Sequence, residues 1–311
     1  MDEIDLAISL MLMANSRTSY TDLADKFNMS VNSVHKRVKS LVDLGIIQNF
    51  KTRLGFSYFP ETINVLMFGR TKVKDKKNLM DRLGKHDSIY NVTQASGNLI
   101  YIHSYIRSFA GLDSLVSFVR EKGEIDTLTI GLDKNSPANL LKGTKKSILS
   151  QLDYLIIYSL KANSRKPISE IARELGYSSK TIRRHLEDLI EQYSILFTVD
   201  WYPDKTSDIC SFIILNIKRD METDENVLLR DLRQKYGQKI VFTWTFSNLP
   251  KLIIIFVWTQ SMKELQDIET DLMEQNFESV DVTILIEGKM YSTWINEYLD
   301  DKVREIKSSS L

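Results

Sequence analysis

The amino-acid sequence predicts an α+β fold in which two three-helix segments alternate with two sheet domains of the order βαββαβ. Shifting the 311-residue chain on itself by 148 residues matches residues 5–47 with residues 153–195 without a gap, and 11 of these 43 positions are identical. The letters ANSR occur in both copies, at residues 14–17 and 162–165. Where identity is lost the hydrophobic pattern is kept, which is typical of duplicated structural units.

Composition indicates a globular protein and excludes several classes. The chain is 43% apolar and 26% charged, and its 41 Lys and Arg balance 41 Asp and Glu, so any affinity for nucleic acid must come from local clusters. The longest apolar run, residues 252–258, has the length of a buried strand, so we expect no membrane span. The single cysteine, Cys210, cannot form an intrachain disulfide, and the acidic first residues do not resemble a secretory signal. We therefore expect a cytoplasmic protein.

The three-helix segments are predicted from apolar spacing and capping residues. Residues 4–12 place apolar side chains on one face, and residues 21–27 form a short second helix. Ser30 can cap a third helix that runs to Leu44, and Ser178 does the same in the second copy. The buried stripe of the first copy's third helix repeats at i, i+4 and i+7 and consists of Val34, Val38 and Leu41.

The third helix of each segment leaves a polar and basic face toward solvent. Asn and Arg side chains can bond base edges, and Lys or Ser can bind phosphates, so this face predicts contact with double-stranded DNA. Residues 45–55 begin with a glycine that can end the helix and continue with short extended pieces, which predicts a wing hairpin. The predicted DNA-binding residues are Asn32, Ser33, Lys36, Arg37, Lys39, Lys51 and Arg53 in the first copy and Ser179, Lys180, Thr181, Arg183 and Arg184 in the second.

The segments between the helical copies predict two four-stranded antiparallel sheets, each with helices on one face. Their strands are apolar at nearly every position, so we expect both faces to be buried, with the open faces packed together within one chain or between two chains. The expected strands are 63–70, 89–95, 99–106 and 124–132 with helices 75–85 and 109–122, then strands 209–217, 240–246, 251–258 and 280–286 with helices 226–236 and 262–275. The expected domains are 1–58, 59–133, a linker at 134–147, 148–202, 203–290, and a C-terminal helix and tail at 291–311.

Residues 29–47, MSVNSVHKRVKSLVDLGII, resemble the recognition helix of the Lrp/AsnC (feast/famine) family of prokaryotic transcription regulators, with its Arg-Val-x-x-Leu core and Gly-Ile-Ile turn. The resemblance implies two winged helix-turn-helix domains and two ferredoxin-like (RAM) domains in one chain. It also implies a sequence-specific transcription regulator, not an enzyme, that associates with itself through its sheet domains as a pseudo-dimer or a homodimer. A small-molecule effector is left open, because the family's Gly-x-Asp loop is reduced to Gly97 in residues 96–99 and is missing from residues 247–250.

Two alternatives stay open beside the regulator. Siroheme decarboxylases share the two-part architecture, and an interaction protein could use both helical segments as scaffold. Neither a metal, a cofactor nor a catalytic constellation is expected, because the four histidines lack metal-ligand spacing and no phosphate loop or nucleophile motif occurs. Those histidines are His35, His86, His103 and His185. Five aromatic residues could line a small-molecule pocket or belong to the core: Trp201, Tyr202, Trp244, Phe246 and Trp258.

The two predicted DNA-binding segments differ in charge. Residues 30–53 carry five Lys or Arg against one Asp, whereas residues 178–200 carry three against four acidic residues. The second copy has no counterpart of Lys51 or Arg53. Its third helix continues with three acidic residues, which would repel phosphates. The sequence therefore predicts that the first segment dominates DNA binding. The acidic residues are Glu187, Asp188 and Glu191.

Overall fold

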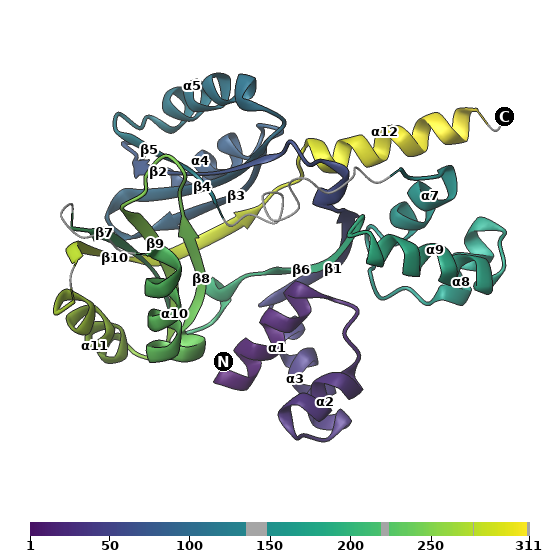
Figure 1. The fold of residues 1–311 in the computed structure, drawn as a ribbon, viewed down its shortest axis with the longest axis horizontal. Helices are drawn as coiled ribbons and strands as arrows, with labels where there is room; N and C mark the ends of the chain where they lie inside the picture. The colour runs from purple at the N-terminus through teal and green to yellow at the C-terminus, as the bar shows by residue number, and fades with distance from the viewer. Residues whose placement is uncertain (135–147, 219–223, 276, 310–311) are drawn as a thin grey trace. The chain divides into compact units, whose positions relative to one another are not determined.

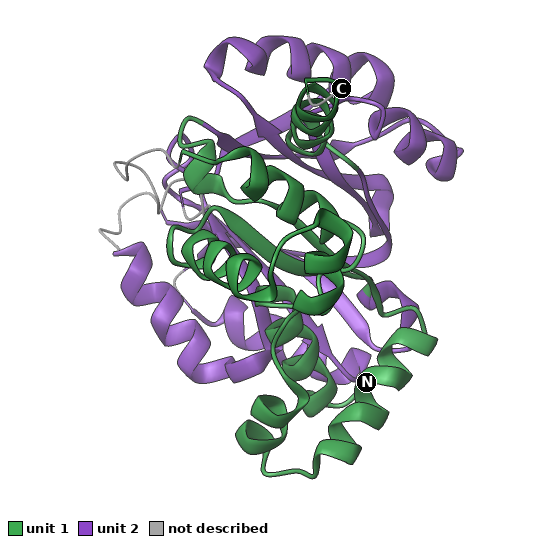
Figure 2. Ribbon diagram, turned by 90° about the vertical axis from the view of Figure 1, so that its right-hand side faces the viewer, with its two compact units in different colours: residues 1–61, 141–202, 292–311 green, residues 62–140, 203–291 purple. Residues whose placement is uncertain are grey.

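The structure is a computed structural model that describes residues 1–134, 148–218, 224–275 and 277–309 (Figure 1). It divides into two compact units (Figure 2). The helical unit combines residues 1–61, 141–202 and 292–311, and the sheet unit combines residues 62–140 and 203–291. All of the expected linker except Lys134 lies outside the described residues. Within the described part, no helix is long and apolar enough to cross a bilayer.

The helical unit contains both predicted three-helix segments, which we call the first and second heads. The third helix of each head begins at a side-chain cap: Ser30 accepts a hydrogen bond from the Ser33 backbone N–H, and Ser178 accepts one from the Thr181 backbone N–H. The predicted buried stripe is confirmed, because Val34, Val38 and Leu41 and their counterparts Ile182, Leu186 and Leu189 are all buried. The first head is α1 (Glu3–Ala14), α2 (Tyr20–Phe27) and α3 (Val31–Asp43), and the second is α7 (Gln151–Ser159), α8 (Ile168–Leu175) and α9 (Ser179–Glu191).

The predicted wing hairpin is wrong. Strand β1 (Ile47–Leu54) does not fold back on itself but pairs antiparallel with β6 (Ile195–Trp201) of the second copy, from Ile47 opposite Trp201 to Leu54 opposite Ile195. The apolar residues at both ends of β1 are buried by this pairing, and a bulge follows Gln48, where the backbone of Asn49 has φ of 49°. A tight turn is therefore replaced by a two-stranded ribbon that joins the heads.

The predicted C-terminal helix is confirmed as α12 (Trp294–Ser308), which packs against α7 and β1. Its Tyr298 hydroxyl lies 2.8 Å from that of Tyr58, in the short turn η1 (Phe56–Tyr58). The Tyr58 hydroxyl also lies 2.7 Å from that of Tyr154 on α7. Lys161 binds Asp300 of the same helix. The C-terminal helix is thus part of the helical unit.

The sheet unit contains both predicted βαββαβ segments in the predicted element order. The two sheets are joined edge to edge in one eight-stranded antiparallel sheet, ordered β5-β2-β4-β3-β10-β7-β9-β8. Strand β10 is longer than expected because it pairs with β7 along its first part and with β3 along its second. The elements are β2 (Ile63–Arg70), α4 (Lys76–Leu83), β3 (Ile89–Ala95), β4 (Leu99–Ile106), α5 (Leu112–Gly123) and β5 (Leu128–Leu132), then β7 (Ile209–Ile217), α10 (Glu225–Tyr236), β8 (Ile240–Thr245), β9 (Leu252–Thr259), α11 (Met262–Met273) and β10 (Phe277–Met290).

Strands β2, β4, β7 and β9 are buried on both faces, as their apolar sequences predict, whereas β8 and β10 are mostly half-buried. Aliphatic residues of each half pack under their own two helices. The opposite faces of the halves contact each other through rings: Tyr101 of β4 and Phe212 of β7 stack with centroids 4.0 Å apart, although these strands are not neighbours in the sheet. The predicted packing of the two open faces therefore occurs within one chain.

Most of the aromatic residues considered for a pocket belong to this core or to β6. Trp201, Phe246 and Trp258 are buried, and the indole N–H of Trp258 donates to Asp208 over 3.1 Å. Trp244 packs against His103, with ring centroids 5.4 Å apart. Burial lowers the pKa of His103 to about 4, so this imidazole is neutral at physiological pH.

Candidate nucleic-acid interface

Helix α3 presents part of its predicted polar face to solvent. Asn32 and Lys36 are exposed, and Lys36 forms no ion pair with any residue that the structure describes. Lys39 is exposed but pairs with Asp43 one turn further along the helix. The Ser33 hydroxyl is 2.8 Å from that of Ser30, so it takes part in the cap. Asn32 and Lys36 remain as the polar side chains available at the start of the helix.

Arg37 is turned toward the body of the head instead of outward. Its guanidinium donates to Asp5 over 2.7 Å and to Asp2 over 2.8 Å, both at the start of α1. Hydrogen bonding to Asp5, assisted by Asp2, raises the pKa of Arg37. Although burial alone would raise it, the pKa of Asp2 is lowered by bonds from the Asp5 N–H and Arg37. Position 37 borders the buried stripe, three residues after Val34, so a long side chain there can reach α1.

Helix α9 presents a larger free basic face. Lys180, Arg183 and Arg184 are exposed, and none of them forms an ion pair within the described part of the chain. Ser179 is exposed as well, whereas the Thr181 hydroxyl lies 2.9 Å from the cap Ser178. All three cations lie in the first half of the helix, where recognition helices contact bases. The exposed carboxylates occupy its second half, at Glu187, Asp188 and Glu191.

The inward contact of Arg37 has an equivalent in the second head. His185, which stands 148 residues after Arg37, contacts Asp153 over 2.7 Å, and Asp153 stands 148 residues after Asp5. Each head thus anchors its recognition helix to its own first helix at the same place. The anchor is a guanidinium spanning two carboxylates in one head and an imidazole beside one carboxylate in the other.

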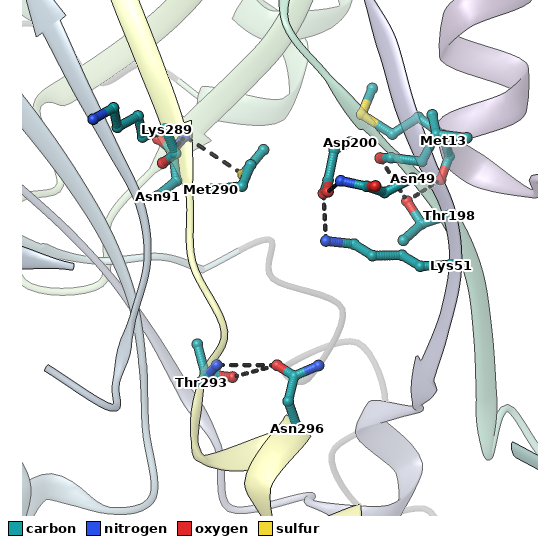
Figure 3. A network of polar contacts seen from close by, with 11 residues as sticks. Met13, Asn49, Lys51, Asn91, Thr198, Asp200, Lys289, Met290, Thr293 and Asn296 are labelled. Carbon is teal, nitrogen blue, oxygen red and sulfur yellow. Dashed lines mark hydrogen bonds and ion pairs between the residues drawn. The ribbon is translucent and has the colours of Figure 1, made fainter. Parts of the chain in front are cut away.

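The two cations expected on the wing are engaged in the ribbon. Lys51 pairs with Asp200 of β6, whose side chain is only 7% exposed, and the side-chain amide of Asn49 donates to the same carboxylate over 3.0 Å (Figure 3). Arg53 is half-buried, with its guanidinium 5.9 Å from the centroid of the Phe56 ring. Without a hairpin, neither side chain extends from a wing tip, and we leave both out of the proposed interface.

Sequence reasoning missed two half-buried arginines, Arg17 and Arg165, which lie where the heads meet. The signal for them in the sequence is the repeated ANSR, which by itself indicates only a duplication. The hydroxyls of Ser16 and Ser164 in these repeats lie 2.6 Å apart, and both residues are fully buried. The two identical loops therefore contact each other.

The histidines have structural surroundings in place of a metal site. His35 packs edge-on against Tyr20, and His86 packs against Phe118 with ring centroids 4.9 Å apart. Burial lowers the pKa of His86. Among the residues described, no three His, Cys, Asp or Glu side chains gather as a metal would require.

Comparison with known proteins agrees with the duplicated architecture. A family model for winged helix-turn-helix DNA-binding domains matches residues 1–48 and 149–192. The HTH-type transcriptional regulator LrpA of Pyrococcus horikoshii is 26% identical over 145 residues, covering 46% of this chain and 99% of that protein. The regulatory protein AsnC of Escherichia coli K12 is 33% identical over 94 residues, covering 30% of this chain and 60% of AsnC.

A solved structure similar over the full length is that of the siroheme decarboxylase NirDL. It aligns with a TM-score of 0.58 at 10% identity and covers 97% of this chain and 99% of that chain. This likeness concerns the fold alone. In sequence, both helical copies match the winged helix-turn-helix model, and the relatives above are regulators of one kind. The chain matches the winged helix-turn-helix model twice and is similar in sequence to the regulators LrpA and AsnC.

Proposed function

We propose that this protein is a sequence-specific DNA-binding transcription regulator with two DNA-binding heads in each chain. The observation that carries the proposal is the exposed first half of α9, with Lys180, Arg183 and Arg184 free of ion pairs among the described residues. Helix α3 presents Asn32 and Lys36 at the equivalent place. Cations at these positions can displace counterions from DNA phosphates, which supplies most of the affinity of such interfaces.

The heads divide base reading and backbone binding unequally. Asn32 can bond adenine through the oxygen and the nitrogen of its side-chain amide, and the guanidinium forks of Arg183 and Arg184 can bind phosphates. The N-terminal ends of α3 and α9 add the positive end of each helix dipole, which favours a nearby phosphate. Lys36 and Lys180 are point charges that suit phosphates. Arg37 contributes indirectly, because its bonds to α1 orient α3.

The proposal is tested by measuring the affinity for DNA as a function of salt concentration. Sites are selected from genomic fragments by the purified protein, and affinity for a selected duplex is then followed by fluorescence anisotropy. Four free cations predict a slope of about −4 in log affinity against log salt, or roughly two decades lost between 50 and 200 mM. Exchanging Lys36, Lys180, Arg183 and Arg184 for Ala should remove this dependence. Lys263→Ala, an exposed cation of α11, is the matched control and should leave the affinity within about twofold.

A siroheme decarboxylase is the second candidate, and the likeness to NirDL over nearly the full length of both chains favours it. The absorbance of the purified protein separates the candidates. A Soret band that survives desalting, together with no retardation of any duplex at low salt, would support the enzyme. A colourless protein that binds DNA with the expected salt slope would support the regulator. A colourless protein that binds no DNA would point to a scaffold role.

A further inference from the structure

The two ANSR loops have the same internal structure. In each loop the asparagine side chain accepts a hydrogen bond from the arginine backbone N–H two residues on, Asn15 from Arg17 and Asn163 from Arg165, both over 3.0 Å. This Asx turn brings the intervening serines to the point where the loops meet. The asparagine, serine and arginine of the repeat therefore have the same role in both copies.

The arginines cross from one copy to the other. Arg17 donates to the backbone carbonyl of Ser164 and, over 3.3 Å, to that of Lys166. Arg165 donates to the backbone carbonyl of Thr18 over 2.9 Å. The guanidinium of Arg17 also lies 5.5 Å from the centroid of the Phe197 ring on β6. We call Arg17, Arg165 and the two serines the clasp.

The backbone of each loop is bonded to the strand of the other copy. The Ser16 N–H donates to the carbonyl of Phe197 over 3.3 Å, and the Ser164 N–H donates to that of Phe50 over 2.8 Å. The ring of Phe50 lies in turn 5.1 Å from the guanidinium of Arg165. The clasp and the β1–β6 ribbon are therefore one connected structure.

The clasp brings two like charges together without a carboxylate. Neither Arg17 nor Arg165 forms an ion pair with any residue described by the structure, and Arg165 Nε is buried without a partner there. Burial lowers the pKa of Arg17, and the charge of Arg165 lowers it further. Two partly buried cations in proximity oppose folding, so stability alone does not explain the pair. The carbonyl bonds that each guanidinium makes across the copies explain it as a geometric link.

This link continues to both recognition helices. Each loop begins at the end of a first helix, α1 or α7, and these helices are anchored to α3 through Arg37 and to α9 through His185. The connected path is thus α3, α1, first loop, second loop, α7, α9. The clasp is therefore connected through the two first helices to both recognition helices.

We propose that Arg17 and Arg165 are positioning residues that hold the two recognition helices at one separation, so that the chain accepts two half-sites of a single spacing. This inference rests on the proposed function for its consequence on DNA, but its structural part does not need DNA. In helix-turn-helix dimers the two half-sites lie about one helical turn apart, about 10 to 10.5 base pairs or a multiple of it. A rigid pair of heads requires that spacing, whereas loosely tethered heads tolerate others.

The structural part is tested by the distance between the two recognition helices. Spin labels are placed at Ser40→Cys on α3 and Asp188→Cys on α9, two exposed positions that are 148 residues apart, in a Cys210→Ser background. The otherwise unchanged protein should give one narrow distance distribution. Arg17→Ala with Arg165→Ala should broaden it several-fold. Lys26→Ala with Arg173→Ala, exposed cations on α2 and α8, should not.

Two further variants keep the test decisive. Arg17→Lys with Arg165→Lys retains the charges but loses the forked donors, so it should broaden the distribution as well. Where the double alanine variant loses its helical circular dichroism, the single variants Arg17→Ala and Arg165→Ala are measured, and each should broaden the distribution. A folded double or single variant with a distribution as narrow as that of the unchanged protein would overturn the proposal.

The DNA part is tested on a selected operator. Inserting about 5 base pairs between half-sites, half a helical turn, should cost the unchanged protein at least about tenfold in affinity. The Arg17→Ala, Arg165→Ala variant should lose less than about threefold on the same change. A clasp variant as sensitive to spacing as the unchanged protein would contradict the positioning role. If the unchanged protein binds no DNA, the proposed function fails, and the label distances still decide whether the clasp positions the heads.

Discussion

The two heads have the same helix order, but among the described residues most cations of α3 in the first head are paired with carboxylates whereas those of α9 in the second head are not. In the first head, Arg37 and Lys39 are paired with carboxylates of the same head, and Lys51 is paired with Asp200 across the ribbon. In the second head, the three cations of α9 are exposed and free of such pairs among the described residues. The head with the larger local excess of positive charge therefore offers fewer free cations to DNA.

This difference shows that the number of charged residues in a sequence segment does not give the number of cations that are free to contact DNA. The sequence predicts a dominant first head from five cations against one acid in residues 30–53. Among the described residues, the local pair of Lys39 with Asp43 and the tertiary pair of Arg37 with Asp2 leave Lys36 as the free cation of the α3 face, so the larger free basic surface lies on the second head. We therefore rank the heads in the reverse order for phosphate binding, and assign base reading by Asn32 to the first.

The largest expected effect tests that ranking directly. Replacing Lys180, Arg183 and Arg184 with Ala should lower the salt slope by about 3 and the affinity at 0.1 M salt by two to three decades, roughly one decade for each phosphate contact. The matched variant changes the residues 148 positions earlier, Asn32, His35 and Lys36, to Ala. It should lower the slope by about 1. Equal slopes for the two triple variants would show that the free cations of α9 do not contact DNA.

The next largest effect is expected for Asn32, because its replacement distinguishes recognition of a base from binding to the DNA backbone. Asn32→Ala should cost about 1 to 3 kcal/mol on the selected site and much less on unrelated DNA, since a bidentate contact to one base is lost. Lys36→Ala should weaken both kinds of DNA alike. Affinities on a panel of single-base substitutions in the site measure this. A uniform loss across the panel for Asn32→Ala would assign that residue to the backbone.

The acidic second half of α9 should limit the second head. Glu187→Lys with Asp188→Ser installs the residues that stand 148 positions earlier, Lys39 and Ser40. Removing two exposed carboxylates and adding a cation should raise affinity about tenfold and make the salt slope steeper by about 1. Unchanged affinity in anisotropy titrations would mean that this end of α9 points away from the duplex.

The anchors of the recognition helices should differ in strength. Arg37→Ala should lower the free energy of unfolding by about 1 to 2 kcal/mol and His185→Ala by less, because Arg37 bonds two carboxylates. The pKa of Asp2 is lowered in the folded state, so its stabilisation is present at neutral pH and is lost as the pH falls below about 4. Thermal unfolding between pH 7 and 3 should therefore show a weaker acid dependence for Arg37→Ala. An unchanged dependence would mean that this anchor contributes no measurable stability.

Local features of the fold could be predicted from the sequence, and long-range pairings could not. Caps such as Ser30 and Ser178, the buried stripe from Val34 to Leu41, and both βαββαβ orders follow from spacing within a few residues. The partners of the β1 residues lie 141 to 154 positions away in β6, and no local pattern distinguishes a wing strand from one arm of such a ribbon. The joining of β3 to β10 is equally non-local.

For the candidate interface, too, the exposed positions could be predicted from the sequence but the ion pairs could not. Exposure of Asn32, Lys36 and the α9 cations follows from helical periodicity, because these positions lie opposite the buried stripe. The ion pairs of Arg37 and Lys51 depend on Asp2, Asp5 and Asp200, which other elements bring into contact. The identity of the two ANSR loops is visible in the sequence. That they contact each other and form the clasp is seen only in the structure.

The smallest expected effect on DNA binding is that of replacing Lys51, which distinguishes a wing that contacts DNA from the β1–β6 ribbon. A wing lysine would contact phosphate, and its loss would lower the salt slope by about 1. In the ribbon its ammonium is paired with Asp200, so Lys51→Ala should leave affinity and salt slope unchanged within about twofold. Among the described residues, the nearly buried Asp200 carboxylate would keep the side-chain amide of Asn49 as its hydrogen-bond donor but would lose its cation, so the variant should unfold more easily, by about 1 to 2 kcal/mol. Asp200→Asn in the same chain should restore part of that loss, since it removes the uncompensated charge. A lower salt slope with unchanged stability would mean that Lys51 leaves Asp200 for the phosphates when DNA is bound, and the first head would then grip DNA as strongly as its sequence suggests.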